Sequence, residues 1–159
     1  MLRNDHKAAY SHAAVARWTD KTDLFSMDWI VVPINHKFHW TLLVVDMRAK
    51  TVAYHDSMGM EGGQRYVNVM FRYLQDEHKA RKGTAMAAVE QKAWTLDPRA
   101  WTPRQLNGVD CGAFVCIVAL FRVLGTDLAQ LAQEHIPFFR LYIAACIVDA
   151  TMYDFLLDV

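Results

Sequence analysis

The chain has 159 residues, enough for one domain, and 53% of them are hydrophobic and 12% aromatic, which excludes an intrinsically disordered protein. Its 17 lysines and arginines balance its 17 aspartates and glutamates, so a nucleic-acid binder that acts through overall positive charge is also excluded. The longest uncharged apolar run, residues 112–121, has about ten residues, about half of what a bilayer-spanning helix needs. We therefore expect a single domain over residues 1–159, with no nucleic-acid or membrane partner.

The N-terminal half predicts a helix followed by three strands. Residues 8–18 are compatible with a helix. Tyr10, Ala14 and Trp18 recur there at a spacing of four residues, which places them on one side of a helix. Three apolar runs then have the length of strands, at residues 29–34, 40–46 and 51–56. Pro33 cannot donate a ladder hydrogen bond, which places the first strand at a sheet edge or near its own end. Residues 47–50 are expected to form a hairpin loop between the second and third strands.

A loop rich in glycine, at residues 57–63, separates this sheet from the clearest helix, at residues 64–79. One stripe of that helix is apolar, with charged residues elsewhere. The stripe consists of Tyr66, Val69, Met70, Tyr73 and Leu74. A short strand at residues 93–96 and a loop at residues 97–107 are expected to follow.

Two apolar helices complete the predicted fold. Residues 111–124 are apolar on nearly all sides, as in a buried helix, and Gly125 follows in the place of a C-cap glycine. The last helix is expected from Phe138 to about Leu156, with Pro137 in its first turn. Helices on both sides of a hairpin-containing sheet predict the α+β class.

Three cysteines, without the spacing of a disulfide framework, predict a reduced, intracellular protein, and the N-terminus has no secretory signal. Cys116 and Cys146 lie inside apolar helical runs and are interpreted as small hydrophobic core residues. Cys111 differs because a glycine-containing loop delivers it to the first turn of a predicted helix. Free amide groups and the helix dipole stabilise a thiolate there, so a nucleophile and a core residue both remain open for Cys111.

A reactive cysteine needs a histidine base and an acid that orients the histidine. If Asp46 pairs with Thr51 in the predicted hairpin, the same register places His39 opposite Met58. Asp56 is two residues from Met58, so it faces the same side as His39. Diagonal neighbours of this kind lie about 7–8 Å apart, within reach of an imidazole–carboxylate hydrogen bond.

Two nearby residues fail the same test. Asp46 lies an odd number of residues from His39 and therefore faces the other side of the sheet, and His55 faces away from Asp56. A three-residue loop would reverse this parity, so the prediction depends on the loop length. A strand-end histidine bonded to a turn aspartate is also a common structural feature, and both interpretations stay open.

Two further residues are candidates for the same site. Gln105 lies in the loop that leads to Cys111, where a side-chain amide donates to a developing oxyanion or is simply solvated. Trp40 faces away from His39 in an ideal strand and is either a core residue or a wall of a substrate channel. His36 and His39 alone, without a second ligand cluster, do not make a zinc site, so no metal is expected.

Three segments taken together resemble the signature of the SUMO-specific (sentrin-specific) cysteine proteases. They are His39–Trp40, Tyr54–Gly59 and Gln105–Gly112. The resemblance extends from about Tyr10 to the C-terminus and includes segments similar to the family's middle helix, at residues 71–77, and the start of its last helix, at residues 136–140.

The resemblance implies a papain-like α+β fold, with a central mixed or antiparallel sheet flanked by helices and the nucleophile at the N-terminus of a buried helix. It implies cleavage after the C-terminal Gly-Gly of SUMO, in precursor maturation or in deconjugation from target lysines, without a metal or organic cofactor. By position, Cys111 would be the nucleophile, His39 the base, Asp56 the orienting acid and Gln105 the oxyanion donor. Trp40 would form a wall of the tunnel that admits Gly-Gly.

The family's catalytic domain carries a further N-terminal segment, which supplies part of the docking surface and a second tunnel tryptophan, and we expect this chain to lack it. The alternatives are a protease for another ubiquitin-like modifier such as NEDD8, and a weakly catalytic binding module for such modifiers. Acetyltransferase effectors share a histidine–acid–cysteine set, but they usually carry glutamate as the acid and lack these motifs. The expected protein is a monomer of the nucleus or the cytoplasm.

Overall fold

The computed structural model describes residues 10–151 and contains one four-stranded sheet in the order β1-β2-β3-β4. The strands are β1 (Trp29–His36), β2 (His39–Asp46), β3 (Thr51–His55) and β4 (Thr95–Asp97). The first three are antiparallel, and β4 is parallel to β3. The sheet is therefore mixed and the class is α+β, as predicted. β1 lies at an edge, where the missing N–H group of Pro33 is tolerated.

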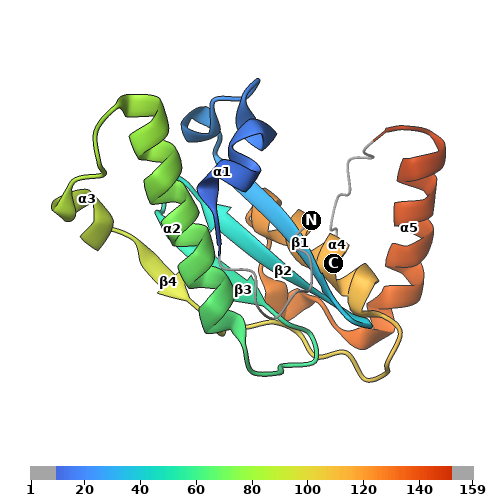
Figure 1. The fold of residues 1–159 in the computed structure, drawn as a ribbon. Helices are drawn as coiled ribbons and strands as arrows, with labels where there is room; N and C mark the ends of the chain where they lie inside the picture. The colour runs from blue at the N-terminus through green and yellow to red at the C-terminus, as the bar shows by residue number, and fades with distance from the viewer. Residues whose placement is uncertain (1–9, 152–159) are drawn as a thin grey trace.

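Helices cover both faces of this sheet. They are α1 (His12–Val15), α2 (Gly63–Lys82), α3 (Ala88–Lys92), α4 (Cys111–Leu124) and α5 (Ile136–Val148). Four short 3₁₀ turns are η1 (Ala16–Thr19), η2 (Leu24–Ser26), η3 (Leu128–Gln130) and η4 (Gln133–His135). Figure 1 shows α2 and α4 on opposite faces of the sheet, with α5 at the side of the molecule, beyond α4.

β2 is the central element because both of its faces are buried. Leu42 and Val44 pack into a cluster with the side chains of α4, whereas Leu43 and Val45 pack into a second cluster with those of α2. Successive side chains of a strand point to opposite faces, so one apolar run supplies both cores. Leu42 and Val44 therefore lie toward α4, and Leu43 and Val45 lie toward α2.

The helix α4 has the predicted bounds. Gly125 follows it with φ +72°, and the next residue, Thr126, donates its N–H to the carbonyl of Phe121 at 2.9 Å. This left-handed cap closes the helix end, as expected for a C-cap glycine. Only one stripe of α4 is buried, however, and Cys116 is exposed. The interpretation of Cys116 as a core residue is therefore wrong, because it lies on the face of α4 away from the sheet.

The N-terminal helix is shorter than predicted. The backbone changes from α-helical to 3₁₀ at Ala16, so the four-residue spacing is not maintained, and Trp18 is exposed. Polar contacts of His12 and Thr19 with Glu77 attach the segment to α2.

Three other features differ from the predictions. The strand β4 starts at Thr95, after the short helix α3, which the sequence analysis did not predict. In α2 the fully buried valine is Val67, in place of Val69. The last helix ends at Val148, before Leu156, because Ala150 has a left-handed backbone with φ +50°.

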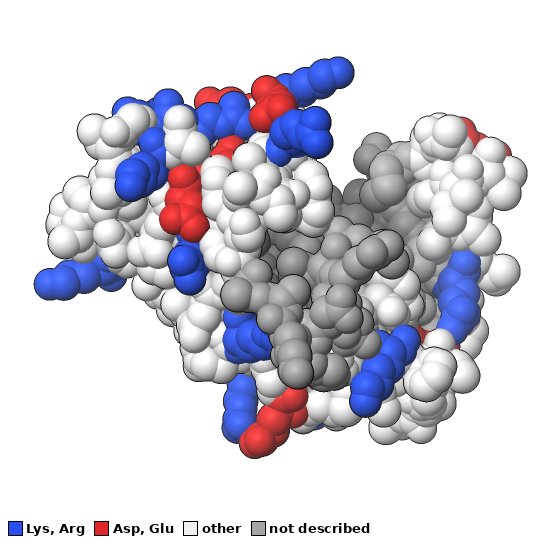
Figure 2. All heavy atoms as spheres, in the orientation of Figure 1, with Lys and Arg blue, Asp and Glu red and all other residues white. Residues whose placement is uncertain are grey.

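The surface carries charges of both signs. On the face in Figure 2, basic and acidic side chains are scattered among neutral ones. Within residues 10–151, no helix is both long and apolar enough to cross a membrane.

One carboxylate of α2 is buried inside the fold. Glu77 is 2% exposed, and its oxygens accept hydrogen bonds from His12 Nε2 (2.8 Å), Thr19 Oγ1 (2.9 Å) and Arg81 Nε (2.8 Å). Burial alone would raise the pKa of Glu77, but the hydrogen bonds from His12, Arg81 and Thr19 outweigh it, and the pKa lies below its ordinary value. Glu77 therefore attaches α1 and η1 to α2.

We expect Glu77→Gln to lower the free energy of unfolding by about 1–3 kcal/mol near neutral pH, because buried charge-assisted hydrogen bonds are weakened. Since the folded pKa lies below the unfolded value of about 4.3, this contribution is present above that pH. It is lost as the pH falls through the folded pKa. Urea unfolding of both proteins at decreasing pH measures the difference.

Glu61→Gln is the matched control, because Glu61 pairs with Arg99 at 2.7 Å but both side chains are exposed. Its expected effect is within about 0.5 kcal/mol. A Glu77→Gln effect no larger than this would contradict the assigned role of Glu77.

Candidate active site

The position of His39 is set by two hairpins. His39 pairs with His36 across a tight turn in which Lys37 has φ +57°. On its other side β2 pairs with β3, with Asp46 opposite Thr51 and Leu42 opposite His55. This is the predicted register, and it confirms the four-residue loop on which the parity argument depended.

His39 and Asp56 form the hydrogen bond that the register predicts. The distance from His39 Nε2 to Asp56 Oδ1 is 2.7 Å, and both residues are buried. The same carboxylate accepts backbone N–H groups from Met58 (2.8 Å), Gly59 (3.1 Å) and Met60 (3.2 Å). Asp56 is thus fixed by the turn that follows it, and the imidazole is fixed by Asp56.

The backbone conformation of this turn favours glycine, and the movable end of Arg104 occupies the space where a side chain would begin. Gly59 has φ +64°, in the left-handed region. A Cβ atom built on Gly59 would also overlap the guanidinium of Arg104. A side chain at this position would disturb the amide groups that hold Asp56.

The hydrogen bond to Asp56 determines which nitrogen of His39 carries a proton. A carboxylate only accepts, so Nε2 is the donor, and in a neutral ring Nδ1 is then the unprotonated nitrogen. Nδ1 is buried and has no hydrogen-bond partner among residues 10–151. The lone pair of His39 Nδ1 is therefore free to accept a proton.

Cys111 is the first residue of α4 and is 5% exposed. The helix packs on the even-numbered face of β2, and a Cβ atom built on Gly112 would lie 3.9 Å from Cδ1 of Trp40. His39 precedes Trp40 and Cys111 precedes Gly112, so each is one residue away from this contact. The side chain of Trp40 is on the α4 side and 41% exposed, so it is not a core residue.

The start of α4 is held by Asp110. Its carboxylate accepts hydrogen bonds from Asn107 Nδ2 (2.6 Å), Gln133 Nε2 (2.7 Å) and Arg140 Nε (3.0 Å). The hydrogen bonds from Asn107 and Arg140 hold the pKa of Asp110 below its ordinary value. The residue before Cys111 is thereby tied to η4 and α5.

Gln105 is buried beside the turn that contains Asp56. Its Oε1 accepts from Ser57 Oγ at 2.6 Å, and its Nε2 donates to the carbonyl of Asn107 at 2.5 Å. The side chain is therefore fixed by hydrogen bonds, and the interpretation as a solvated loop residue does not hold. Sequence reasoning missed Ser57, Asn107 and Asp110 as partners; the available signal was their place within the matched segments.

His55 is separate from this arrangement, as the parity argument predicted. It is 2% exposed, and its Nδ1 lies 2.9 Å from Thr102 Oγ1. Burial, assisted by the positive charge of Arg122, lowers the pKa of His55 to about 4. The described residues contain no group of three histidine, cysteine, aspartate or glutamate side chains that could hold a metal ion.

Several exposed apolar side chains lie close in the chain to the candidate site residues, and we call this set the apolar rim. It consists of Phe38, Trp40, Met58, Met60, Trp101, Leu106 and Val109. All of these residues lie within a few positions of the predicted site residues or in the loop between β4 and α4. Exposed apolar side chains that form a contiguous patch are typical of surfaces that contact other proteins.

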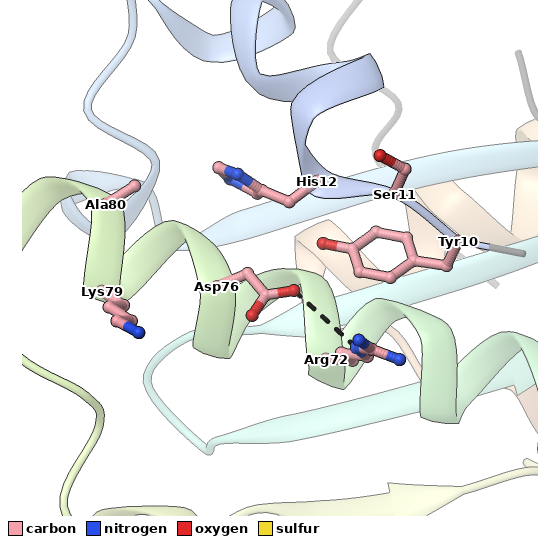
Figure 3. A pocket seen from close by; sticks show the side chains of 7 residues that line it. All are labelled: Tyr10, Ser11, His12, Arg72, Asp76, Lys79 and Ala80. Carbon is pink, nitrogen blue, oxygen red and sulfur yellow. Dashed lines mark ion pairs between the residues drawn. The ribbon is translucent and has the colours of Figure 1, made fainter.

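A hollow of ≈ 590 Å³ lies elsewhere, between α1 and α2 (Figure 3). Its lining includes Tyr10 and an ion pair between Arg72 and Asp76, at 3.8 Å. The guanidinium of Arg72 lies 5.3 Å from the centre of the Tyr10 ring. None of the predicted site residues lines this hollow, so we do not assign it to the chemistry.

Residues 2–150 match the family described as the Ulp1 protease family, C-terminal catalytic domain. Sentrin-specific protease 2 of Mus musculus is 38% identical over 129 residues, which cover 81% of this chain. The chain spans 21% of the length of that relative.

Two solved structures share the fold. The Ulp1-like SUMO protease catalytic domain of Chaetomium thermophilum superposes with a TM-score of 0.77 and 27% identity, covering 92% of this chain and 58% of that one. The yeast Ulp1 protease domain, solved in complex with the SUMO ortholog Smt3, has a TM-score of 0.75 and 26% identity. That match covers 89% of this chain and 62% of the Ulp1 domain.

The pKa of His55 predicts a loss of stability in acid. At a pH above about 6.5, the pKa of His55 in the unfolded chain, His55 is neutral in both the folded and the unfolded state. At a pH between about 6.5 and about 4, only the unfolded chain binds the proton. We expect the free energy of unfolding to fall, relative to that of His55→Leu, by up to about 3 kcal/mol from pH 7 to pH 4. Urea unfolding across this range tests it, and a pH-independent difference between the two proteins would refute it.

Proposed function

The chain belongs to the Ulp1 protease family, whose catalytic domain matches residues 2–150, and we propose that it is a cysteine protease that cleaves after the C-terminal Gly-Gly of SUMO. We further propose that residues 1–159 form one catalytic domain. The observation that carries the proposal is the 2.7 Å hydrogen bond from His39 to Asp56, which leaves Nδ1 of His39 buried and unprotonated, while Cys111 begins the helix α4.

In the proposed mechanism, Nδ1 of His39 takes the thiol proton of Cys111, and Asp56 stabilises the imidazolium that forms. The thiolate is stabilised by the N-terminus of α4 and attacks the carbonyl carbon of the terminal glycine. The imidazolium then protonates the leaving amine, and a thioester joins Cys111 to the modifier. Water, activated by His39, hydrolyses the thioester and restores the enzyme.

The negative charge on the carbonyl oxygen needs donors that are already in place. We assign one donor to the side-chain amide of Gln105, whose orientation is fixed by Ser57 and Asn107. The backbone N–H of Cys111 is the second, because the first amides of a helix have no intrahelical acceptor. Together these groups form the proposed oxyanion hole.

We attribute the proposed preference for Gly-Gly to Trp40 and Gly112. The indole lies within van der Waals distance of the position a Cβ atom would take on Gly112. We propose that Trp40 and Gly112 form part of the wall along which the tail lies, where glycine residues fit and residues with a Cβ atom collide. The apolar rim supplies contact area for the folded modifier.

We propose an intracellular location, in the nucleus or the cytoplasm. Cys111, Cys116 and Cys146 are all free of disulfides, as is usual for proteins kept under reducing conditions. SUMO or a related modifier and its conjugates are the proposed partners.

Fluorogenic C-terminal coumarin conjugates of SUMO, NEDD8 and ubiquitin test the substrate. We expect release from the SUMO conjugate, and loss of at least about a thousandfold in turnover for Cys111→Ala, because the nucleophile is removed. Preferred cleavage of the NEDD8 conjugate would change the assigned substrate. Binding of a modifier without cleavage would leave a binding module instead of an enzyme.

The orienting acid is tested by an aspartate pair on the same hairpin. Asp56→Asn is expected to lower kcat by about a hundredfold or more, since the amide favours the wrong tautomer of His39. Asp46→Asn is the control: Asp46 accepts backbone N–H groups from Arg48 and Ala49, which an asparagine also does, and it lies at the far end of β2. Equal losses in the two variants would show that the assignment of Asp56 is wrong.

A further inference from the structure

We propose that Ser57 is a positioning residue that holds the side-chain amide of Gln105 with its N–H group toward the reacting carbonyl. This inference rests on the proposed function, because it assigns a role within the same site. Ser57 is not one of the predicted site residues, and no role was predicted for it from the sequence.

Ser57 holds Gln105 at two points. Its hydroxyl donates to Gln105 Oε1 at 2.6 Å, and its backbone carbonyl accepts the N–H of Gln105 at 3.0 Å. Ser57 is 4% exposed, so water does not readily replace the hydroxyl as a partner. The two bonds fix both the backbone and the side chain of Gln105.

The second end of the amide is also fixed. Gln105 Nε2 donates to the carbonyl of Asn107, whose own side-chain Oδ1 accepts the N–H groups of Val109 (3.0 Å) and Asp110 (3.1 Å). The Asn107 carbonyl therefore belongs to a rigid turn directly before Cys111. This turn sets the direction in which the NH₂ group of Gln105 points.

These partners determine which way round the amide lies. A backbone carbonyl only accepts, so the group that faces Asn107 is the NH₂ group, and the oxygen must face Ser57. The Ser57 hydroxyl then supplies the one proton that the buried oxygen needs. Since an amide nitrogen has two N–H groups, one remains for the oxyanion after the other is given to Asn107.

Ser57 also couples the acid to the oxyanion donor. It directly follows Asp56, whose carboxylate is fixed by the amides of Met58, Gly59 and Met60. The same short turn thus places the group that orients His39 and the group that orients Gln105. Removing the hydroxyl leaves Gln105 Oε1 without its donor and frees the amide to rotate.

A double-mutant cycle tests this role with the SUMO coumarin conjugate. We expect Ser57→Ala to lower kcat by about ten- to a hundredfold with KM changed less than about threefold, because donor placement matters most in the transition state. In a Gln105→Ala background the same substitution is expected to change kcat less than about twofold. Ser57→Cys, a weaker donor of similar size, should give an intermediate kcat.

Thr19→Ala is the matched control, because it also removes a hydroxyl that donates to a side-chain oxygen, that of Glu77, but far along the chain from the site. It is expected to lower the thermal midpoint without lowering kcat. The proposal would be overturned if Ser57→Ala lowered kcat equally in the wild-type and Gln105→Ala backgrounds, or did not lower kcat at all.

A second measurement does not depend on activity. In the NMR spectrum of the ¹⁵N-labelled chain, the two Nε2 protons of Gln105, assigned by their absence in Gln105→Ala, should be well separated and slow to exchange. In Ser57→Ala their resonances should move to the values of a glutamine whose whole amide group turns freely about the Cγ–Cδ bond. Unchanged resonances would overturn the role of Ser57, whereas a wild-type chain that cleaves no conjugate but shows the expected resonances would overturn only the proposed function.

Discussion

The hairpin register between β2 and β3 is the constraint on which the rest of the site depends. A four-residue loop sets Asp46 opposite Thr51, and every later pair follows. A shift by one residue would turn Asp56 to the face opposite His39 and would expose the apolar side chains that both cores need. The cores therefore hold the register, and the register holds the 2.7 Å bond from His39 to Asp56.

The proposed nucleophile, Cys111, is placed by a separate set of contacts near the start of β2. Packing of α4 on Leu42 and Val44 brings its first turn to Trp40. Asp110 then attaches that turn to α5 through Arg140, and Asn107 and Ser57 orient Gln105 between the two halves. Each proposed catalytic group is thus held by neighbours that take no part in bond making.

Much of the fold was predictable because its signals are local. The apolar runs of β1, β2 and β3, and the helix from Cys111 to Leu124 with its cap at Gly125, follow from composition and from the conformational freedom of glycine. The break at Ala16 and the helix α3 were missed because short, mixed segments take their conformation from what they contact. The buried carboxylate of Glu77 was missed for the same reason: its partners come from distant segments.

By itself, the sequence determined the strands, the parity that unites His39 with Asp56, and the place of Cys111 at a helix start, since all three depend on residues close in the chain. Only the tertiary structure decided that Trp40 lies against Gly112, that Asp110 binds Arg140, and that Ser57 fixes the amide of Gln105. These contacts join residues far apart in the chain, where no periodicity or spacing carries information. They form only when helices pack on both faces of β2, and packing is a property of the whole chain.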